Sequence, residues 1–179
     1  MNRPEKGFRT KRRMAEALKT LLRKKPLDRI RVHEITDLCE LNRQTFYYHF
    51  PDVYALFSWA LRQTVEETRD QLDYSIPWRE QLLSLLRRME QDRSFYLTAL
   101  DPRFEPEFRP FFAEQLTQSE DNPLSAPQVT AFVSILLHWL QRENRETPEE
   151  LLAFFEQLMR DSSWTPETLD LLLGGGGHI

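Results

Sequence analysis

Glycine, cysteine and long hydrophobic runs are all scarce in this sequence of 179 residues. Gly7 is one of five glycines, and the other four are the consecutive residues 174–177. Between those points no residue adopts a positive φ easily, so tight β-hairpin turns would be hard to build. Because 40% of the residues are hydrophobic, the chain can still bury a core. We therefore expect an all-α fold.

The single cysteine, Cys39, cannot form an internal disulfide, so nothing points to an oxidising compartment. Residues 1–14 lack the apolar stretch of a signal peptide, and the most apolar run, residues 132–140, is too short to cross a bilayer. We expect a cytoplasmic protein with no membrane partner. His33 and Asp37 lie one helical turn apart, but without a third ligand they indicate a solvated helix face. No catalytic or phosphate-loop motif is recognisable, so we expect neither an enzyme nor a cofactor.

Charge is divided unevenly along the chain. Residues 1–50 hold 13 Lys or Arg against 6 Asp or Glu, whereas residues 51–179 hold 11 against 22. The first segment is therefore +7 and the second −11, and no lysine follows Lys25. A basic head on an acidic body is typical of a protein in which only the head meets a polyanion. A solvated basic helix is the alternative interpretation.

Apolar spacing predicts two helices in the basic segment before residue 40. The first is expected at residues 10–25, with Thr10 as its N-cap and Pro26 as its stop. Its apolar stripe consists of Met14, Ala17, Leu18, Leu21 and Leu22. The second is expected at residues 32–39. Its inward residues are Val32, Ile35 and Leu38.

A third, very short helix is expected in the segment NRQTFYYHF, residues 42–50. Asn42 is a good N-cap, because its side-chain oxygen can accept from a free N–H group of the first turn. At about 100° per residue, Phe46 and Phe50 fall on one side and can anchor the helix, which leaves a polar, aromatic outer face. Two short helices joined by a turn of three residues are typical of a helix-turn-helix, whose second helix enters the DNA major groove.

A fourth helix is expected to begin near Pro51 and Asp52 and to run toward about Asp73. Thr147 and Thr165 are expected N-caps, each followed by Pro at the first helical position. Six further helices are expected near 78–92, 94–100, 105–119, 126–144, 148–161 and 166–173. This pattern divides the chain into a head at 1–52, a helical body at 53–173 and a frayed tail at 174–179.

The segment VHEITDLCELNRQTFYYHF resembles the DNA-binding part of the tetracycline-repressor (TetR) family of bacterial transcriptional regulators, and the likeness covers roughly residues 8–57. It implies a three-helix helix-turn-helix head on a larger helical-bundle body that binds a ligand and dimerises. Residues 132–159 resemble the dimerisation region of the same family, loosely that of regulators related to dihydroxyacetone kinase. The resemblance implies a dimer interface on the two helices at 126–144 and 148–161. Its expected residues are Leu136, Leu140, Leu152 and Phe155.

The resemblance also implies which side chains meet DNA. The chemistry is suitable, because Arg43 can pair with guanine, Gln44 with adenine, and the methyl group of Thr45 with a thymine methyl. Tyr and His donors can fix the register on phosphates. For Tyr47 and Tyr48, packing against the body is the alternative. The expected DNA-contacting residues are Arg31, Asn42, Arg43, Gln44, Thr45, Tyr47, Tyr48 and His49.

Three positions depart from the family pattern. Arg31 stands where the family commonly has a capping Thr, so that bond is lost, although Arg can touch phosphate instead. Glu40 stands where a turn Gly is common, which implies strain in the left-handed region and a negative charge near DNA. Val53 replaces a Lys that often holds phosphate. These changes bear on DNA affinity rather than on the fold.

The resemblance implies a homodimeric, sequence-specific regulator of a near-palindromic operator, most simply a repressor released by a small-molecule inducer. One alternative keeps the DNA-binding head but has a body that senses a protein partner. Another is a helical adaptor or enzyme with a relict head. Neither the operator nor the effector can be deduced from the residues.

Overall fold

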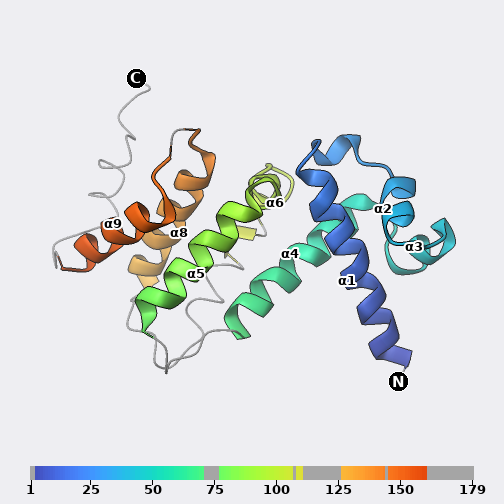
Figure 1. Cartoon of the computed structure of the whole chain (residues 1–179), viewed down its shortest axis with the longest axis horizontal. Coiled ribbons are helices and arrows are strands. Elements are labelled where there is room, and N and C mark those ends of the chain that lie inside the picture. Colours follow the sequence, from blue (N-terminus) through green and yellow to red (C-terminus); the bar gives the residue numbers. More distant parts are fainter. Residues whose placement is uncertain (1–2, 71–76, 107, 111–125, 144, 161–179) are drawn as a thin grey trace.

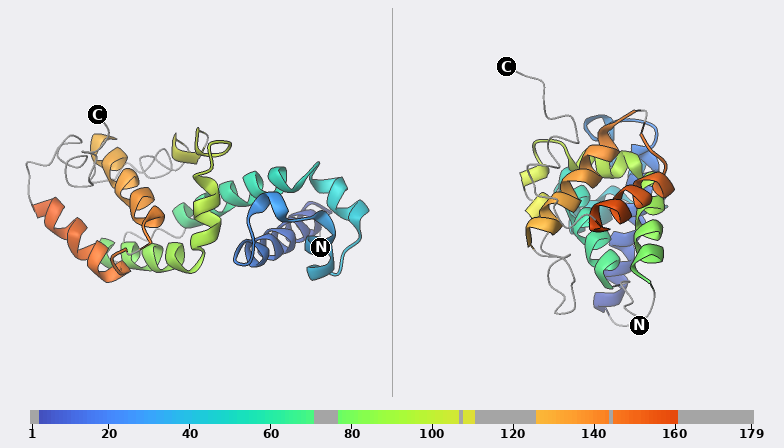
Figure 2. Two further views of the ribbon diagram at one scale, coloured as in Figure 1. Left: turned by 90° about the horizontal axis from the view of Figure 1, so that it is seen from above. Right: turned by 90° about the vertical axis from the view of Figure 1, so that its left-hand side faces the viewer.

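The computed structural model describes residues 3–70, 77–106, 108–110, 126–143 and 145–160. The described residues form helices and the loops between them, with no strand, so the expected all-α fold is confirmed. The molecule is elongated, with α1, α2 and α3 at one end and α5, α8 and α9 at the other (Figures 1 and 2). The helices are α1 (Arg3–Leu22), η1 (Leu27–Arg29, a 3₁₀ turn), α2 (Val32–Leu38), α3 (Arg43–His49), α4 (Val53–Asp70), α5 (Trp78–Gln91), α6 (Arg93–Ala99), α8 (Ala126–Gln141) and α9 (Pro148–Arg160).

Helix α1 is longer at its start than the sequence predicted. It begins at Arg3, and Thr10 lies inside it with its hydroxyl donating to the Lys6 carbonyl, so the expected cap at Thr10 is wrong. Pro4 is tolerated in the first turn, where its missing N–H is not needed. The added turns are held by Phe8, whose ring meets that of Trp59 on α4 edge-on at 5.8 Å. This tertiary contact has no local signal in the sequence.

The apolar stripe of α1 is buried as expected, and it packs against α2 and α4. Helix α2 begins at Val32 as expected and ends one residue earlier than expected, and Leu38 is 54% exposed instead of facing inward. Helix α2 ends at Leu38, and the buried position passes to Cys39, whose thiol donates to the Arg13 carbonyl. The prediction for Leu38 is therefore wrong, because the buried side of the helix continues from Ile35 to Cys39, four residues on, and leaves Leu38 on the exposed side.

The turn between α2 and α3 contains the strain that the sequence suggested. Glu40 has a φ of 51°, in the left-handed region. A side chain disfavours this region because Cβ approaches the following carbonyl oxygen. The N–H of Leu41 then donates to the Thr36 carbonyl at 2.9 Å, which closes the turn and directs the chain into α3.

Helix α4 leads from the head into the body and packs against α1 (Figure 1). The Asp52 carboxylate accepts from the Ala55 N–H at 2.8 Å at the helix start, as the sequence suggested. Phe57 of α4 contacts Phe95 of α6 and Phe104, with ring centroids 5.1 and 4.6 Å apart. These aromatic contacts join the start of α4, next to the head, to the middle of the molecule.

In the body, α5 packs on α9, and α6 packs on both α5 and α8. The expected start of α9 is confirmed: Glu150 accepts from the Thr147 N–H at 2.8 Å, and Thr147 Oγ1 accepts from the Glu150 N–H at 3.3 Å. The helix expected at 105–119 is described only as far as residue 110. The helix expected at 166–173, its cap at Thr165 and the tail at 174–179 lie outside the described residues.

Candidate nucleic-acid interface

Helix α3 has one buried side and one exposed side. Phe46 is fully buried and Phe50 nearly so, and their rings lie 6.1 Å apart beneath the helix. Phe50 continues into the head core by contacting Trp59 at 5.8 Å. Tyr47 and Tyr48 are 57% and 78% exposed. The anchoring role expected for the two phenylalanines is confirmed, and the tyrosines are not packed against the body.

The start of α3 is fixed by Asn42. Its Oδ1 accepts from the Thr45 N–H at 2.7 Å and from the Thr45 hydroxyl at 2.9 Å, so the expected N-cap is confirmed. These two bonds also orient Thr45 and use its hydroxyl proton. Arg43 and Gln44 lie in the same first turn with exposed side chains. The polar residues are thus presented at a defined helix end rather than on a loose loop.

Arg31 lies at the N-cap of α2, and its side chain makes no capping bond, as expected. The start of α2 is stabilised instead by a side chain inside the helix: the Glu34 carboxylate accepts a hydrogen bond from the Arg31 N–H at 2.9 Å. Lys25 Nζ lies 2.6 Å from the same carboxylate, and this bond is the main cause that lowers the pKa of Glu34. The Arg31 guanidinium donates to the Asp28 carbonyl at 2.9 Å and remains exposed.

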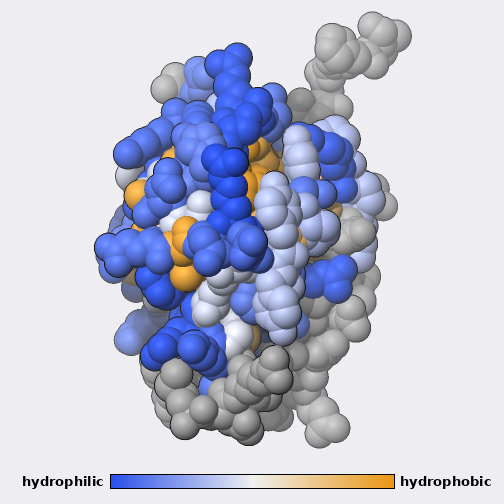
Figure 3. All heavy atoms as spheres, turned by 90° about the vertical axis from the view of Figure 1, so that its right-hand side faces the viewer, coloured by the Kyte–Doolittle hydropathy of each residue, from blue (hydrophilic) through white to orange (hydrophobic). Residues whose placement is uncertain are grey.

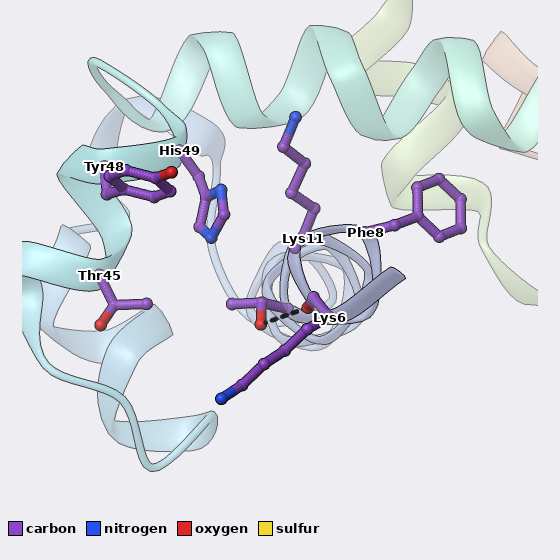
Figure 4. A pocket seen from close by; sticks show the side chains of 8 residues that line it. Lys6, Phe8, Lys11, Thr45, Tyr48 and His49 are labelled. Atoms are coloured by element: carbon purple, nitrogen blue, oxygen red, sulfur yellow. Dashed lines mark hydrogen bonds between the residues drawn. The ribbon is translucent and has the colours of Figure 1, made fainter. Parts of the chain in front are cut away.

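A cleft of about 950 Å³ separates the start of α1 from α3 (Figure 4). Thr45, Tyr48 and His49 line it from α3, and Lys6 and Lys11 are among the residues that line it from α1. This side of the head was not predicted from the sequence, because the first helix was expected to begin only at residue 10. The basic composition of residues 1–14 was the feature of the sequence that could have indicated it.

His49 lies between α3 and α1, where it is partly buried. Burial is the main cause that lowers its pKa, and the nearby Lys11 ammonium acts in the same direction. Lys11 itself points toward α4 (Figure 4), with Nζ 5.6 Å from the ring centroid of Phe50 and 5.7 Å from that of Trp59. The cleft therefore combines a neutral imidazole with an ammonium group that is stabilised by aromatic faces.

The end of the molecule that carries the head is mostly hydrophilic, with pale residues of intermediate hydropathy and scattered apolar side chains (Figure 3). Exposed large side chains in this part of the fold include Leu38, Tyr47 and Tyr48. Tyrosine presents both an apolar ring and a polar hydroxyl, which suits contact with a nucleic acid.

The four residues expected at a dimer interface lie in the interior of the chain. Their side chains are at most 3% exposed within the single chain and pack the core of the body. They are Leu136, Leu140, Leu152 and Phe155. Phe132 and Phe154, on the same two helices, are only partly buried, and the ring of Phe132 contacts that of Phe155 at 4.5 Å.

Within the described ranges, no group of three or more His, Cys, Asp or Glu is arranged to hold a metal ion. None of the helices in that part of the chain is both long and apolar enough to cross a membrane.

No protein-family model matches the chain. A curated relative, the HTH-type dhaKLM operon transcriptional activator DhaS of Lactococcus lactis subsp. lactis (strain IL1403), is 32% identical over 104 residues. This match covers 56% of the chain and 55% of the relative, so it spans little more than half the length of that protein.

Two solved structures share the fold. The dihydroxyacetone kinase operon activator DhaS superposes with a TM-score of 0.66 and 22% identity, covering 84% of this chain and 94% of that one. A TetR transcriptional regulator from Streptococcus agalactiae 2603V gives a TM-score of 0.58 and 22% identity, covering 87% and 96%. None of the three names describes an enzyme.

A capped recognition-type helix on a three-helix head, joined to a helical body, defines a helix-turn-helix protein. The chain has the fold of the TetR-type regulators, so the fold that the resemblance at residues 8–57 implied is confirmed.

Proposed function

We propose that this chain is a transcriptional regulator that binds double-stranded DNA sequence-specifically through α3. The observation that carries the proposal is the construction of α3 itself, which is capped by Asn42 and anchored by Phe46, with Arg43 and Gln44 exposed in the first turn. The anchor and the cap fix the helix, so the exposed side chains can read base edges in the major groove.

The charge division supports the same assignment. A head of +7 attracts the phosphate backbone, while a body of −11 is repelled by it and stays away from the duplex. If a dimer makes on the order of 6 phosphate contacts, affinity falls by roughly 10³ between 50 and 200 mM salt. A gel-shift on genomic fragments across this range tests the proposal. Absence of binding, or a flat salt response, contradicts it.

Dimerisation forms part of the proposal, because a single short recognition helix offers little surface for tight specific binding. Helices α8 and α9 are our candidates for a two-fold interface, with Phe132 and Phe154 as the contacts and the four core residues behind them. The operator is then a near-palindrome with half-sites about 34–36 Å apart, or a multiple of that distance. Sedimentation showing a monomer at micromolar concentration, with tight specific binding intact, contradicts the dimer.

The direction of regulation has two candidates. A repressor released by a small-molecule inducer is the mode that the family resemblance suggested. Activation is the second candidate, because the curated relative is named as an activator of the dhaKLM operon and one of the two solved structures as an activator of the dihydroxyacetone kinase operon. A reporter placed behind the identified operator separates the two modes when the gene is deleted: expression rises for a repressor and falls for an activator.

The effector is proposed to act through the body. Small molecules that release the protein from its operator, or retain it there, identify a ligand-sensing body. A body that responds to a protein partner gives no such change with small molecules alone. If the chain binds no DNA at all, the alternative of a helical adaptor or enzyme with a relict head is favoured.

A further inference from the structure

The first turns of α1, which the sequence did not predict to be helical, form one wall of the cleft beside α3. Lys6 extends from α1 toward the side of the cleft lined by Thr45, whereas Phe8 points away toward α4 (Figure 4). The contact between Phe8 and Trp59 holds these turns on the head. Lys6 is therefore carried on an ordered element next to the recognition helix.

The cations of the head differ in whether a carboxylate neutralises them. Toward the end of α1 and just beyond it, three basic side chains are paired with carboxylates. The pairs are Lys19 with Asp92, Arg23 with Asp92, and Lys25 with Glu34. Among the described residues, Lys6 and Lys11 in the cleft have no carboxylate partner. The cleft where α1 meets α3 thus carries two positive charges that no carboxylate of the described residues offsets.

The hydrogen-bond donors in the cleft also suit an anion. The hydroxyl protons of Thr10 and Thr45 are already donated, to the Lys6 carbonyl at 2.9 Å and to the N-cap side chain of α3 at 2.9 Å. The groups left to donate are the ammonium groups of Lys6 and Lys11, the hydroxyl of Tyr48 and an imidazole N–H of His49. All are groups that bind phosphate oxygens.

The dimensions of α3 explain why an additional anchor is useful. Seven residues at a rise of about 1.5 Å give a helix of roughly 10 Å, which reaches only a few base pairs. The major groove is about 12 Å wide, so an element beside a helix in the groove stands over the sugar–phosphate wall. The start of α1 occupies this position relative to α3.

We propose that the cleft between the start of α1 and α3 receives the sugar–phosphate backbone along one wall of the major groove, with Lys6 as the cation that contacts a phosphate. This inference rests on the proposed function and deepens it, because it assigns a phosphate contact to residues outside the helix-turn-helix. Lys6 positions the head on DNA without reading sequence, and Lys11 adds positive potential behind it.

The test uses the full-length protein and a 30-base-pair duplex of unrelated sequence, so that no operator is needed. The duplex affinity of the parent, Lys6→Ala, Lys6→Arg and Lys24→Ala is measured between 50 and 200 mM salt. Lys24 is the matched control, because it is exposed and lies just beyond the end of α1, roughly 25 Å from Lys6 by helical rise. Thermal melting establishes that the variants fold alike.

Lys6→Ala should reduce the slope of log affinity against log salt by about 1 for each protomer bound. It should weaken binding roughly tenfold per contact at 0.1 M salt, and Lys6→Arg should restore most of the loss. Lys24→Ala should leave the slope unchanged. Equal slopes for Lys6→Ala and Lys24→Ala overturn the phosphate contact while leaving DNA binding in place. A parent protein that binds no duplex overturns the proposed function as well.

Discussion

Arg23 Nη2 lies 2.7 Å from Asp92 Oδ1, which joins the end of α1 to the junction between α5 and α6. Lys19 Nζ approaches the same carboxylate at 3.7 Å and stands over the ring of Phe95 at 4.9 Å. Asp92 and Lys19 are only 18% and 14% exposed. A partly buried carboxylate of the body therefore forms ion pairs with two basic side chains of the head.

Replacing Asp92 with Ala should lower the free energy of unfolding by on the order of 1–3 kcal/mol, because Lys19 loses its charged partner in a poorly solvated place. Arg12→Ala is the matched comparison, since its 3.5 Å pair with Glu67 is exposed on both sides and should be worth less than about 1 kcal/mol. Urea denaturation measures both. Equal losses in the free energy of unfolding for the two variants would show that the ion pairs of Asp92 contribute no more than an exposed surface pair.

Glu40→Gly should stabilise the head by roughly 1 kcal/mol, because glycine adopts the φ of 51° without a Cβ clash. The control is Glu40→Gln, which removes the negative charge but keeps the strain. Both variants should bind DNA more tightly at low salt, since each removes a repulsive charge. Thermal melting should separate them, and a Glu40→Gln protein as stable as Glu40→Gly would assign the cost to charge instead of backbone strain.

DNA affinity should depend on pH through His49. The pKa of His49 is lowered by burial and by Lys11, so the free protein holds it neutral near pH 7. A phosphate in the cleft favours the protonated form, and binding should therefore strengthen as pH falls below the ordinary range of histidine. His49→Gln should abolish this increase in affinity at low pH. His33→Gln, which changes an exposed residue of α2, should retain it. Affinity that is independent of pH in the parent would remove His49 from the phosphate site.

The lowered pKa of His49 has the opposite effect on the stability of the free protein. Folding favours neutral His49, so its stabilising contribution is present above the ordinary pKa of histidine and is lost as pH falls through the lowered value. Acidification should thus weaken the free protein slightly while it strengthens the complex.

Local patterns predicted most of α3. Its cap depends on Asn42 and Thr45, three residues apart, and its anchors on Phe46 and Phe50, one helical turn apart, so both follow from the geometry of one helix. The start of α1 could not be predicted in this way. It depends on a contact between Phe8 and α4, far along the sequence, and the cleft beside α3 was missed with it.

The body shows a second limit of sequence patterns. The apolar positions Leu136 and Leu140 were recognised, but periodicity indicates that a residue is buried without indicating what covers it. The structure places both in the core of the single chain. Leu38 illustrates the same problem at a helix end, where one residue changes which side chain faces inward.

Phe46→Ala should destabilise the head by roughly 3–5 kcal/mol, because a fully buried aromatic ring is replaced by a cavity. Tyr47→Phe removes one exposed hydroxyl and should leave the melting temperature unchanged. It should weaken specific and nonspecific DNA binding alike if that hydroxyl holds phosphate. A Tyr47→Phe protein that binds like the parent would identify Tyr47 as ordinary surface.

Arg43→Ala should act on recognition alone. Arg43 is exposed in the first turn of α3, so its loss should not change stability. A bidentate pair with guanine is worth about 1–3 kcal/mol of discrimination, and the variant should therefore relax the preference at one base pair in each half-site. Affinity for a panel of single-base operator variants measures this, with Lys6→Ala as the comparison, because a phosphate contact weakens every sequence equally. If Arg43→Ala also weakens all sequences by the same factor, Arg43 holds the backbone, and the reading of bases must be assigned to Gln44 and its neighbours.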